Sequence, residues 1–274
     1  MGREPPWPDA NVEFLAMRPI PSLRVARSGQ GRPLLLINGL GANLEMWQPF
    51  IAGLGNQREL IGLDLPGTGG SAAARWPMRM GQLARLVADA LDRLGYDRVD
   101  VLGYSLGGVV AQELAHRAPD RVDRLVLCAT SPGLPSVPPN PLVAALMLTP
   151  ARYWNRQLAE LILPIIAGGR TARDEDALQA QIKERLARPP TALGYLFQLY
   201  AVSGWSSHAW LGQLRHRALV VHGDRDPVVP LANGRYLADA LPHGRLEVIP
   251  GAGHLFLLDD PASATPQIEA FLAT

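Results

Sequence analysis

A serine lies between two glycines in the segment Gly103-Tyr104-Ser105-Leu106-Gly107. The apolar run before it, Val99–Leu102, predicts a strand, and apolar residues recur at helical spacing after it. A Gly-x-Ser-x-Gly sequence at a strand-to-helix turn is typical of a serine nucleophile. The glycines leave room for a sharp turn that lifts the hydroxyl above the sheet, where a substrate can reach it. Ser105 is therefore the predicted nucleophile, of the kind that attacks a carbonyl carbon.

Such a nucleophile needs donors for the negative charge that develops on the carbonyl oxygen. The helix that begins at Leu106 would point backbone N–H groups and the positive end of its dipole at this charge. A second glycine-rich loop, Asn38-Gly39-Leu40-Gly41-Ala42, follows the apolar run Leu34–Ile37. We expect the N–H groups of Leu40 and Leu106 to form the oxyanion hole. An ordinary strand-ending turn explains the loop equally well when it is taken alone.

A general base must take the serine proton, and the chain has six histidines. His254 follows the flexible turn Pro250–Gly253 behind the apolar run Leu246–Ile249, so it can leave the carboxyl end of a sheet strand. It is the predicted base. The other five histidines are expected to be structural or solvated, namely His116, His208, His216, His222 and His243.

An acid must orient the base, and it should also leave a strand end. The segment Val220–Pro230 offers Asp224 and Asp226. We favour Asp226, because the loop has cleared the strand by that point and Pro227 fixes its exit. The chain order Ser105, Asp226, His254 is the order of an α/β-hydrolase triad.

The elements that must position these residues are short apolar strands alternating with helical patterns. Leu34–Ile37, Leu60–Leu63, Val99–Leu102, Leu125–Leu127, Leu219–Val221 and Leu246–Ile249 are predicted strands, and Val12–Met17 with Leu23–Arg27 is a predicted edge hairpin. Alternation of this kind predicts an α/β fold with a doubly wound, mostly parallel sheet. The alternation stops after Ser131 and resumes near His216. We therefore expect a hydrolase core of residues 1–131 and 212–274 and an inserted helical cap of residues 132–211.

Composition excludes several classes of protein. Apolar residues make up 47% of the 274 residues and charged residues 19%, which excludes a disordered chain. The net charge of +1 gives no field for binding nucleic acid. No apolar run reaches the ~18 residues of a membrane span. The single cysteine, Cys128, lies in an apolar run and is expected to be a buried, inert thiol. We expect a cytoplasmic protein without metal or cofactor, since no signal peptide and no metal-ligand spacing is visible.

The sequence resembles the α/β-hydrolases over essentially its whole length, and among them the intracellular medium-chain-length poly(3-hydroxyalkanoate) depolymerases. The segments that carry the resemblance are Leu35–Phe50 (LLINGLGANLEMWQPF), Ile61–Ser71 (IGLDLPGTGGS), Val101–Leu106 (VLGYSL), Ala192–Leu211 (ALGYLFQLYAVSGWSSHAWL) and Gly253–Leu257 (GHLFL). One departure is Leu106, where we expect tryptophan in these depolymerases. The resemblance implies a catalytic triad of Ser105, Asp226 and His254, with oxyanion donors at Leu40 and Leu106.

The implied reaction is hydrolysis of a carboxylic ester, with a hydroxyalkanoate polyester or oligomer as the favoured substrate. An apolar cap also suits aliphatic esters better than sugars or phosphates. The alternatives are a small-molecule carboxylesterase, a lactonase or a carbon–carbon bond hydrolase on the same triad, and a non-catalytic ligand-binding relative. The expected partner is a small or polymeric ester, and a lipid or polyester granule surface is a further candidate; the oligomeric state stays open.

Overall fold

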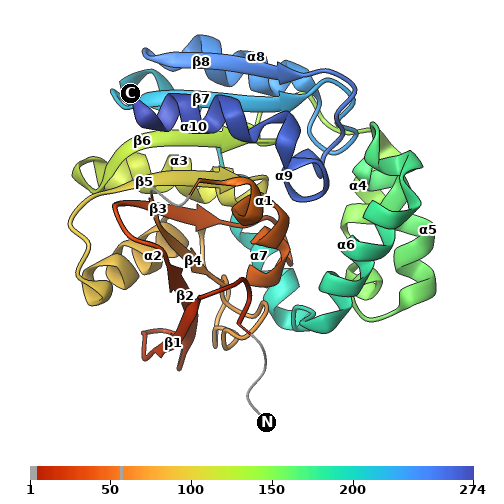
Figure 1. Cartoon of the computed structure of the whole chain (residues 1–274), viewed down its shortest axis with the longest axis horizontal. Coiled ribbons are helices and arrows are strands. Elements are labelled where there is room, and N and C mark those ends of the chain that lie inside the picture. The colour runs from red at the N-terminus through yellow and green to blue at the C-terminus, as the bar shows by residue number, and fades with distance from the viewer. Residues whose placement is uncertain (1–4, 56–57) are drawn as a thin grey trace.

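One eight-stranded sheet forms the centre of the molecule (Figure 1). The computed structural model describes residues 5–55 and 58–274. Along the sheet the strand order is β1-β2-β4-β3-β5-β6-β7-β8. The strands are β1 (Asn11–Leu15), β2 (Leu23–Ser28), β3 (Arg32–Ile37), β4 (Arg58–Leu63), β5 (Val99–Tyr104), β6 (Val122–Cys128), β7 (Arg217–Gly223) and β8 (Gly244–Ile249).

All six predicted core strands and the edge hairpin are present. Strand β2 pairs antiparallel with both β1 and β4, and all other neighbouring strands are parallel. The largest difference from the predicted strand bounds is at β6, which begins at Val122, three residues before the predicted start at Leu125. The α/β-hydrolase prediction for the fold is confirmed.

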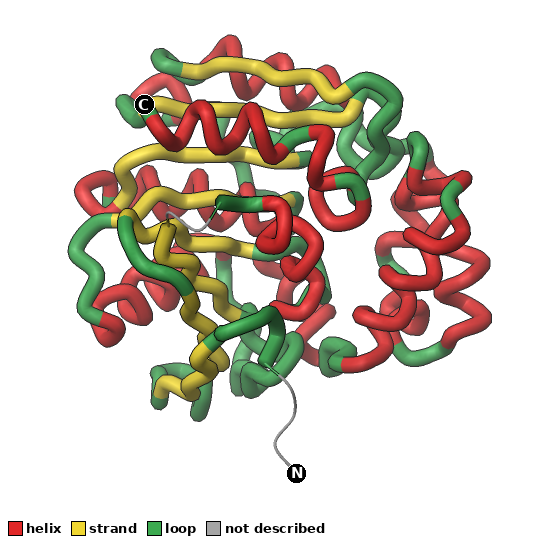
Figure 2. Tube along the Cα trace, in the orientation of Figure 1, coloured by secondary structure: helices red, strands yellow, loops and turns green. Residues whose placement is uncertain are grey.

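Helices cover both faces of the sheet (Figure 2). On one face lie α2 (Met80–Leu94), α3 (Leu106–Arg117) and α8 (Leu231–Ala240), and on the other α1 (Gln48–Gly53), α9 (Phe256–Asp259) and α10 (Thr265–Ala273). Side chains alternate between the two cores along each strand, as a pleated strand requires. In β3, for example, Leu35 and Ile37 enter the first core, whereas Leu34 and Leu36 enter the second.

Between β6 and β7 the chain forms four α-helices, three short 3-10 turns and no strand within the described residues. The α-helices are α4 (Pro141–Met147), α5 (Arg156–Ala167), α6 (Glu175–Ala187) and α7 (Ala192–Val202). Helices α4, α5 and α6 form a layer beside the sheet, on the right of Figure 1. Helix α7 instead contacts α2, and its Ala201 packs into the same core as α2.

The apolar residues of this inserted segment do not all pack inward. Val143, Ile162, Leu163 and Ile166 are buried, but the outward-facing side chains of Leu142, Leu148, Trp154, Leu161 and Ile165 are exposed. Packing onto the core therefore explains only part of the apolar character that the sequence shows here.

Cys128 is fully buried, as expected, and burial raises the pKa of its thiol. Among the helices that the structure describes, none is both long and apolar enough to cross a membrane.

Candidate active site

Ser105 occupies a strained turn between β5 and α3. Its backbone has φ of 54° and ψ of −118°, a conformation that side chains rarely adopt. The flanking glycines make the turn possible. A β-carbon at Gly103 would lie 2.4 Å from the Gly107 carbonyl oxygen, and one at Gly107 would lie 1.9 Å from the Ile37 carbonyl oxygen. The steric reason expected for both glycines is thus confirmed.

His254 and Asp226 complete a chain of polar contacts that starts at Ser105. The Ser105 Oγ lies 3.1 Å from His254 Nε2, and His254 Nδ1 lies 2.8 Å from Asp226 Oδ2. A carboxylate can only accept, so Nδ1 carries the proton and Nε2 is left as an acceptor facing the serine. A histidine in this tautomer can take a proton from the hydroxyl.

The loop after β7 brings Asp226, and not Asp224, to the histidine. The Asp226 side chain is fully buried, and its Oδ1 accepts the N–H groups of Val228 and Val229 at 2.8 Å each. Asp224 is exposed, and its Oδ1 accepts the N–H of Gly251 at 2.7 Å. Asp224 therefore holds the turn before the histidine, whereas Asp226 contacts the imidazole.

A second histidine lies behind Asp226. His222 is fully buried, and its Nε2 donates to the Val229 carbonyl oxygen at 2.8 Å and lies 3.6 Å from Asp226 Oδ2. Burial lowers the pKa of His222, against the opposing effect of the Asp226 charge. A neutral His222 helps to shape the Asp226 loop. The sequence signal was its position at the end of β7, next to the acid.

Of the remaining histidines, three make contacts of a structural kind. His116 stacks on Trp210 with ring centroids 4.1 Å apart, His208 bonds Tyr236 at 2.8 Å, and His216 bonds the Pro119 carbonyl oxygen at 3.0 Å.

The two expected oxyanion donors lie close to Ser105, one on a loop and one at the start of a helix. Leu40 lies in the turn after β3, and Leu106 is the first residue of α3, where backbone N–H groups have no partner within the helix. No described residue accepts a hydrogen bond from either N–H. Gly39 lies close to the serine, because a β-carbon there would be 3.2 Å from Ser105 Cβ.

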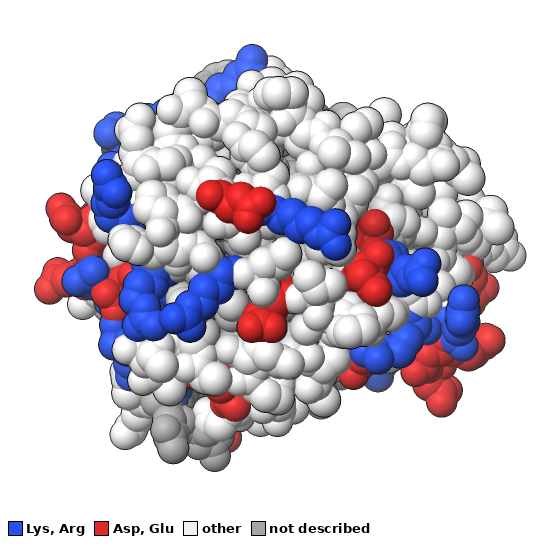
Figure 3. Space-filling view, turned by 90° about the horizontal axis from the view of Figure 1, so that it is seen from above, with Lys and Arg blue, Asp and Glu red and all other residues white. Residues whose placement is uncertain are grey.

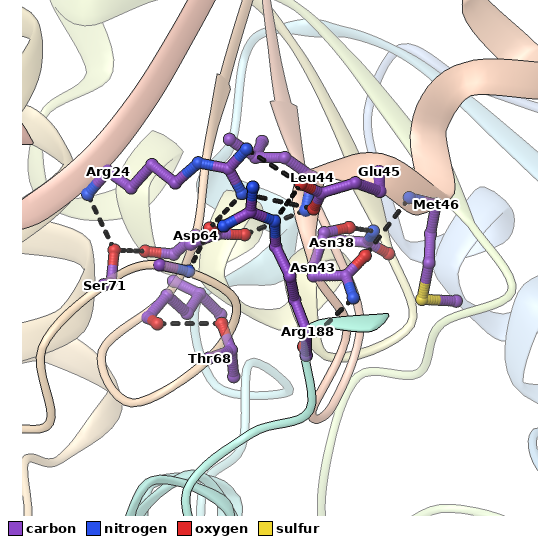
Figure 4. A network of polar contacts seen from close by, with 12 residues as sticks. Arg24, Asn38, Asn43, Leu44, Glu45, Met46, Asp64, Thr68, Ser71 and Arg188 are labelled. Carbon is purple, nitrogen blue, oxygen red and sulfur yellow. Dashed lines mark hydrogen bonds and ion pairs between the residues drawn. The ribbon is translucent and has the colours of Figure 1, made fainter. Parts of the chain in front are cut away.

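A buried polar network fixes the residues on both sides of Leu40 (Figure 4). Asn38 accepts the Gly39 N–H at 2.8 Å and donates to the Asn43 carbonyl oxygen at 2.9 Å. Asp64 accepts the N–H groups of Leu44 and Gly70 at 2.8 Å each. Asp64 thus ties its own loop, through Gly70, to Leu44 in the turn after the Leu40 loop.

Three ion pairs extend this network to the inserted segment. Arg24 bonds Asp64 at 3.1 Å and Glu45 at 2.8 Å. Arg188 reaches the same Glu45 at 2.5 Å from beyond the end of α6. Burial raises the pKa of Asp64 to about 6, and the Arg24 charge opposes that rise.

The inserted segment also contacts the histidine loop directly. The Ala167 carbonyl oxygen, at the end of α5, accepts the His254 N–H at 2.6 Å, and the Arg170 N–H donates to the Gly251 carbonyl oxygen at 2.9 Å. Gly169 between them has φ of +56°, and a β-carbon there would lie 2.2 Å from the Gly253 nitrogen. The end of α5 therefore fits flush against the loop that carries His254.

A pocket opens onto Ser105 and His254 between the core and the inserted segment. Apolar and small residues form one part of its wall: Gly39, Leu40, Ala42, Met46, Met147, Ile166 and Leu255. Polar side chains of Tyr104, Arg152, Tyr153 and Arg185 form the rest. The expected apolar pocket is therefore only partly apolar. Sequence reasoning missed Arg152, Tyr153 and Arg185, since nothing in their spacing distinguishes them from other residues of the segment.

Comparison with known proteins places the chain in a family. Residues 32–261 match the family described as the alpha/beta hydrolase fold, and the chain belongs to this family. It is 43% identical over 241 residues to a poly(3-hydroxyalkanoate) depolymerase of Ectopseudomonas oleovorans, which covers 88% of this chain and 84% of that protein. The resemblance to such depolymerases is thus confirmed.

Two further relatives act on other esters by their names. The chain is 32% identical to a pimeloyl-[acyl-carrier protein] methyl ester esterase of Aromatoleum aromaticum, over 86% of this chain and 96% of that protein. Its fold superposes on the enol-lactonase of Burkholderia xenovorans LB400 with a TM-score of 0.83 and 25% identity, over 96% of this chain and 100% of that one. The chain is an ester-hydrolysing enzyme of the α/β-hydrolase family.

Proposed function

We propose that the enzyme cleaves aliphatic carboxylic esters with Ser105 as nucleophile, His254 as general base and Asp226 as the residue that orients His254. His254 Nε2 takes the proton of Ser105 as Oγ attacks the ester carbonyl carbon. The N–H groups of Leu40 and Leu106 bind the oxyanion, a contribution of ~3 kcal/mol for each donor. His254 then protonates the departing alcohol, and water releases the acid from Ser105 by the same steps.

The observation that carries this proposal is the unbroken contact chain from Ser105 through His254 to Asp226 at the wall of one pocket. The strained turn at Ser105 supports it, because such strain persists only where surrounding structure holds it in place. The free N–H groups at Leu40 and Leu106 supply the second requirement of acyl transfer.

Within this reaction the substrate that we favour is a hydroxyalkanoate polyester or its oligomers. The similarity to a depolymerase supports this choice, and so do the apolar walls at Met46, Met147 and Ile166. We also propose that residues 132–211 act as a cap over the pocket. Contact with a polyester granule would suit its exposed apolar side chains, which include Leu142, Leu148, Leu161, Leu193 and Leu196. A cytoplasmic location stays a prediction.

The surface viewed in Figure 3 is compatible with such contact. Charged side chains form a band across that face, and broad uncharged areas lie on either side of it.

The test is hydrolysis of 4-nitrophenyl octanoate and of a poly(3-hydroxyoctanoate) suspension by the wild type and Ser105→Ala. We expect the substitution to lower kcat by at least a thousandfold and to leave the melting temperature within a few degrees. Retention of a tenth of the wild-type rate would overturn the assigned nucleophile. Hydrolysis of 4-nitrophenyl octanoate without hydrolysis of the polyester would reject the polyester as substrate and indicate a small-molecule carboxylesterase.

A lactonase or carbon–carbon bond hydrolase is the second candidate, favoured by the fold similarity to an enol-lactonase. A panel of lactones and ring-cleavage diketones, measured beside the 4-nitrophenyl alkanoates, separates the two. A kcat/KM at least tenfold higher on either of these classes would replace the polyester assignment.

A further inference from the structure

Two buried arginines line the pocket that holds Ser105. Arg152 comes from the 3-10 turn Pro150–Tyr153, and Arg185 comes from α6. Their exposed fractions are 2% and 5%. Burying a guanidinium group is costly unless an anion or a full set of acceptors compensates for the lost water.

Neither arginine has an anionic partner among the described residues. Over residues 5–55 and 58–274, no carboxylate oxygen lies within 4.0 Å of either guanidinium group. Other buried arginines of the same chain are paired, Arg24 with Glu45 and Asp64 and Arg124 with Asp100. The lack of a partner is therefore particular to the pocket arginines and is not a general feature of this arginine-rich protein.

Arg152 has a structural role that accounts for most of its donors. Its Nη1 donates to the carbonyl oxygens of Leu146 and Thr149, at 3.1 and 2.5 Å, close to the end of α4. Its Nη2 donates to the Tyr195 hydroxyl at 2.8 Å. Its Cζ also lies 4.9 Å from the ring centroid of Tyr153 and 5.4 Å from that of Tyr195, so aromatic rings offset part of its charge, but none of these partners is an anion.

Arg185 has fewer contacts than Arg152, although its Cζ lies 5.6 Å from the centroid of the Tyr153 ring. Its single hydrogen bond runs from Nη1 to the Tyr153 hydroxyl at 3.2 Å, and its buried Nε has no partner among the described residues. A guanidinium group offers five N–H donors in a planar fork that matches a carboxylate. Arg185 thus brings unused donors and a full charge to the wall of the pocket.

The same contact links Arg185 to the loop of the expected oxyanion donor. The Tyr153 hydroxyl that accepts from Arg185 donates in turn to the Leu40 carbonyl oxygen at 2.6 Å. An anion bound at Arg185 would therefore lie in the same cavity as the reacting carbonyl, and on the side formed by the inserted segment.

We propose that Arg185, with Arg152 beside it, binds a carboxylate carried by the substrate, and that the enzyme prefers esters with a free carboxylate near the scissile bond. This inference rests on the proposed function and narrows its substrate class. In a poly(3-hydroxyalkanoate) only the carboxyl end fits, because there the alcohol part of the last ester is itself a 3-hydroxy acid. Interior ester bonds carry no charge. The enzyme would release 3-hydroxy acids one by one from the carboxyl ends of chains and oligomers.

The test compares the linear trimer of 3-hydroxyoctanoic acid with its methyl ester, which differs only in the charge of the end group. We expect the wild-type kcat/KM to be at least tenfold higher for the free acid, and this ratio to fall at least tenfold in Arg185→Gln. Arg156→Gln is the matched control, because Arg156 is exposed and pairs with Glu160 on the surface of α5. The control should keep the wild-type ratio. A wild-type ratio near one, or the same ratio in Arg185→Gln as in the wild type, would overturn the proposal.

A second measurement needs no substitution of an arginine. Octanoate should inhibit wild-type hydrolysis of 4-nitrophenyl butyrate at a concentration at least tenfold lower than octanamide, which has the same chain without the charge. Equal inhibition by the two compounds would overturn the carboxylate site, and so would equal inhibition by octanoate and inorganic phosphate. If no ester were hydrolysed, the proposed function would fail by itself. Calorimetry of octanoate and octanamide with the Ser105→Ala protein would then still decide whether the carboxylate site exists.

Discussion

Asp226→Asn tests the hydrogen-bond logic of the site in detail. The position of Oδ1 faces two N–H donors, from Val228 and Val229, at 2.8 Å each. In the side chain created by this substitution, the amide oxygen must take the Oδ1 position and accept from these two N–H groups. The NH2 group cannot take that position, because it is itself a donor. The NH2 group then points at His254 Nδ1, and the imidazole must move its proton to Nε2 to accept from it. In that tautomer Nε2 can no longer take the proton of Ser105.

The expected loss in kcat is about 10⁴-fold, or about 5 kcal/mol of activation free energy, the scale seen when a triad histidine is held in the wrong tautomer. The assay is hydrolysis of 4-nitrophenyl octanoate under saturating substrate. Asp224→Asn is the matched control, because Asp224 contacts only the Gly251 N–H and not the imidazole. It should cost less than tenfold. A loss below a hundredfold in Asp226→Asn, or a larger loss in Asp224→Asn, would refute the reasoning.

Three further predictions follow from other parts of the structure. Gly169→Ala should lower kcat at least tenfold, because its methyl group meets the loop of His254, whereas Gly204→Ala, at φ of +73° in open space, should alter only stability; equal kcat values in the two variants would count against the contact. The kcat/KM for straight-chain 4-nitrophenyl esters should rise from acetate towards the medium-chain range by up to fourfold per methylene, at ~0.8 kcal/mol each, until the pocket is full. A preference for acetate would indicate a small, closed pocket. Burial raises the pKa of Asp259 to about 7, so the stability of the wild type should fall as pH rises through 7 while that of Asp259→Asn does not. In urea titrations from pH 5 to pH 8 the difference in unfolding free energy should grow by about 3 kcal/mol in favour of the variant; a difference that stays constant with pH would show that the carboxyl is not buried as described.

The core of the fold could be predicted because its signals are local. Each parallel strand is a short apolar run, since both of its faces are buried, as Leu34–Ile37 shows with two residues in each core. The turn at Ser105 could also be predicted from the sequence, because only glycine fits at positions 103 and 107. Loop residues at strand ends could be ranked for the same reason, and the structure brings Asp226 and His254 together across 28 positions of sequence.

The wall of the pocket could not be predicted in this way. Arg152 and Arg185 are two of many arginines in a chain whose only lysine is Lys183, and neither belongs to a motif. Their significance depends on which acidic side chains are absent around them, and that is a property of the folded molecule alone. The exposure of apolar side chains on α4 and α5 could not be predicted for a similar reason. The sequence shows that these residues are apolar, but it does not show which of them pack against another element.

The inserted segment contacts both loops that carry the proposed catalytic groups. Its Tyr153 holds the Leu40 carbonyl oxygen at 2.6 Å, and its Gln198 accepts the Gly41 N–H at 2.9 Å, so both contacts fix the loop that offers an oxyanion donor. Its Ala167 fixes the backbone of His254. The helices and turns that line the pocket are the same ones that make these three hydrogen bonds. A substitution that reshapes the pocket is therefore expected to move Leu40 or His254 as well, unless the three hydrogen bonds are kept. If the proposed function holds, we therefore expect specificity to be coupled to turnover through these hydrogen bonds, so that altered substrate preference comes with altered kcat wherever a substitution displaces one of them.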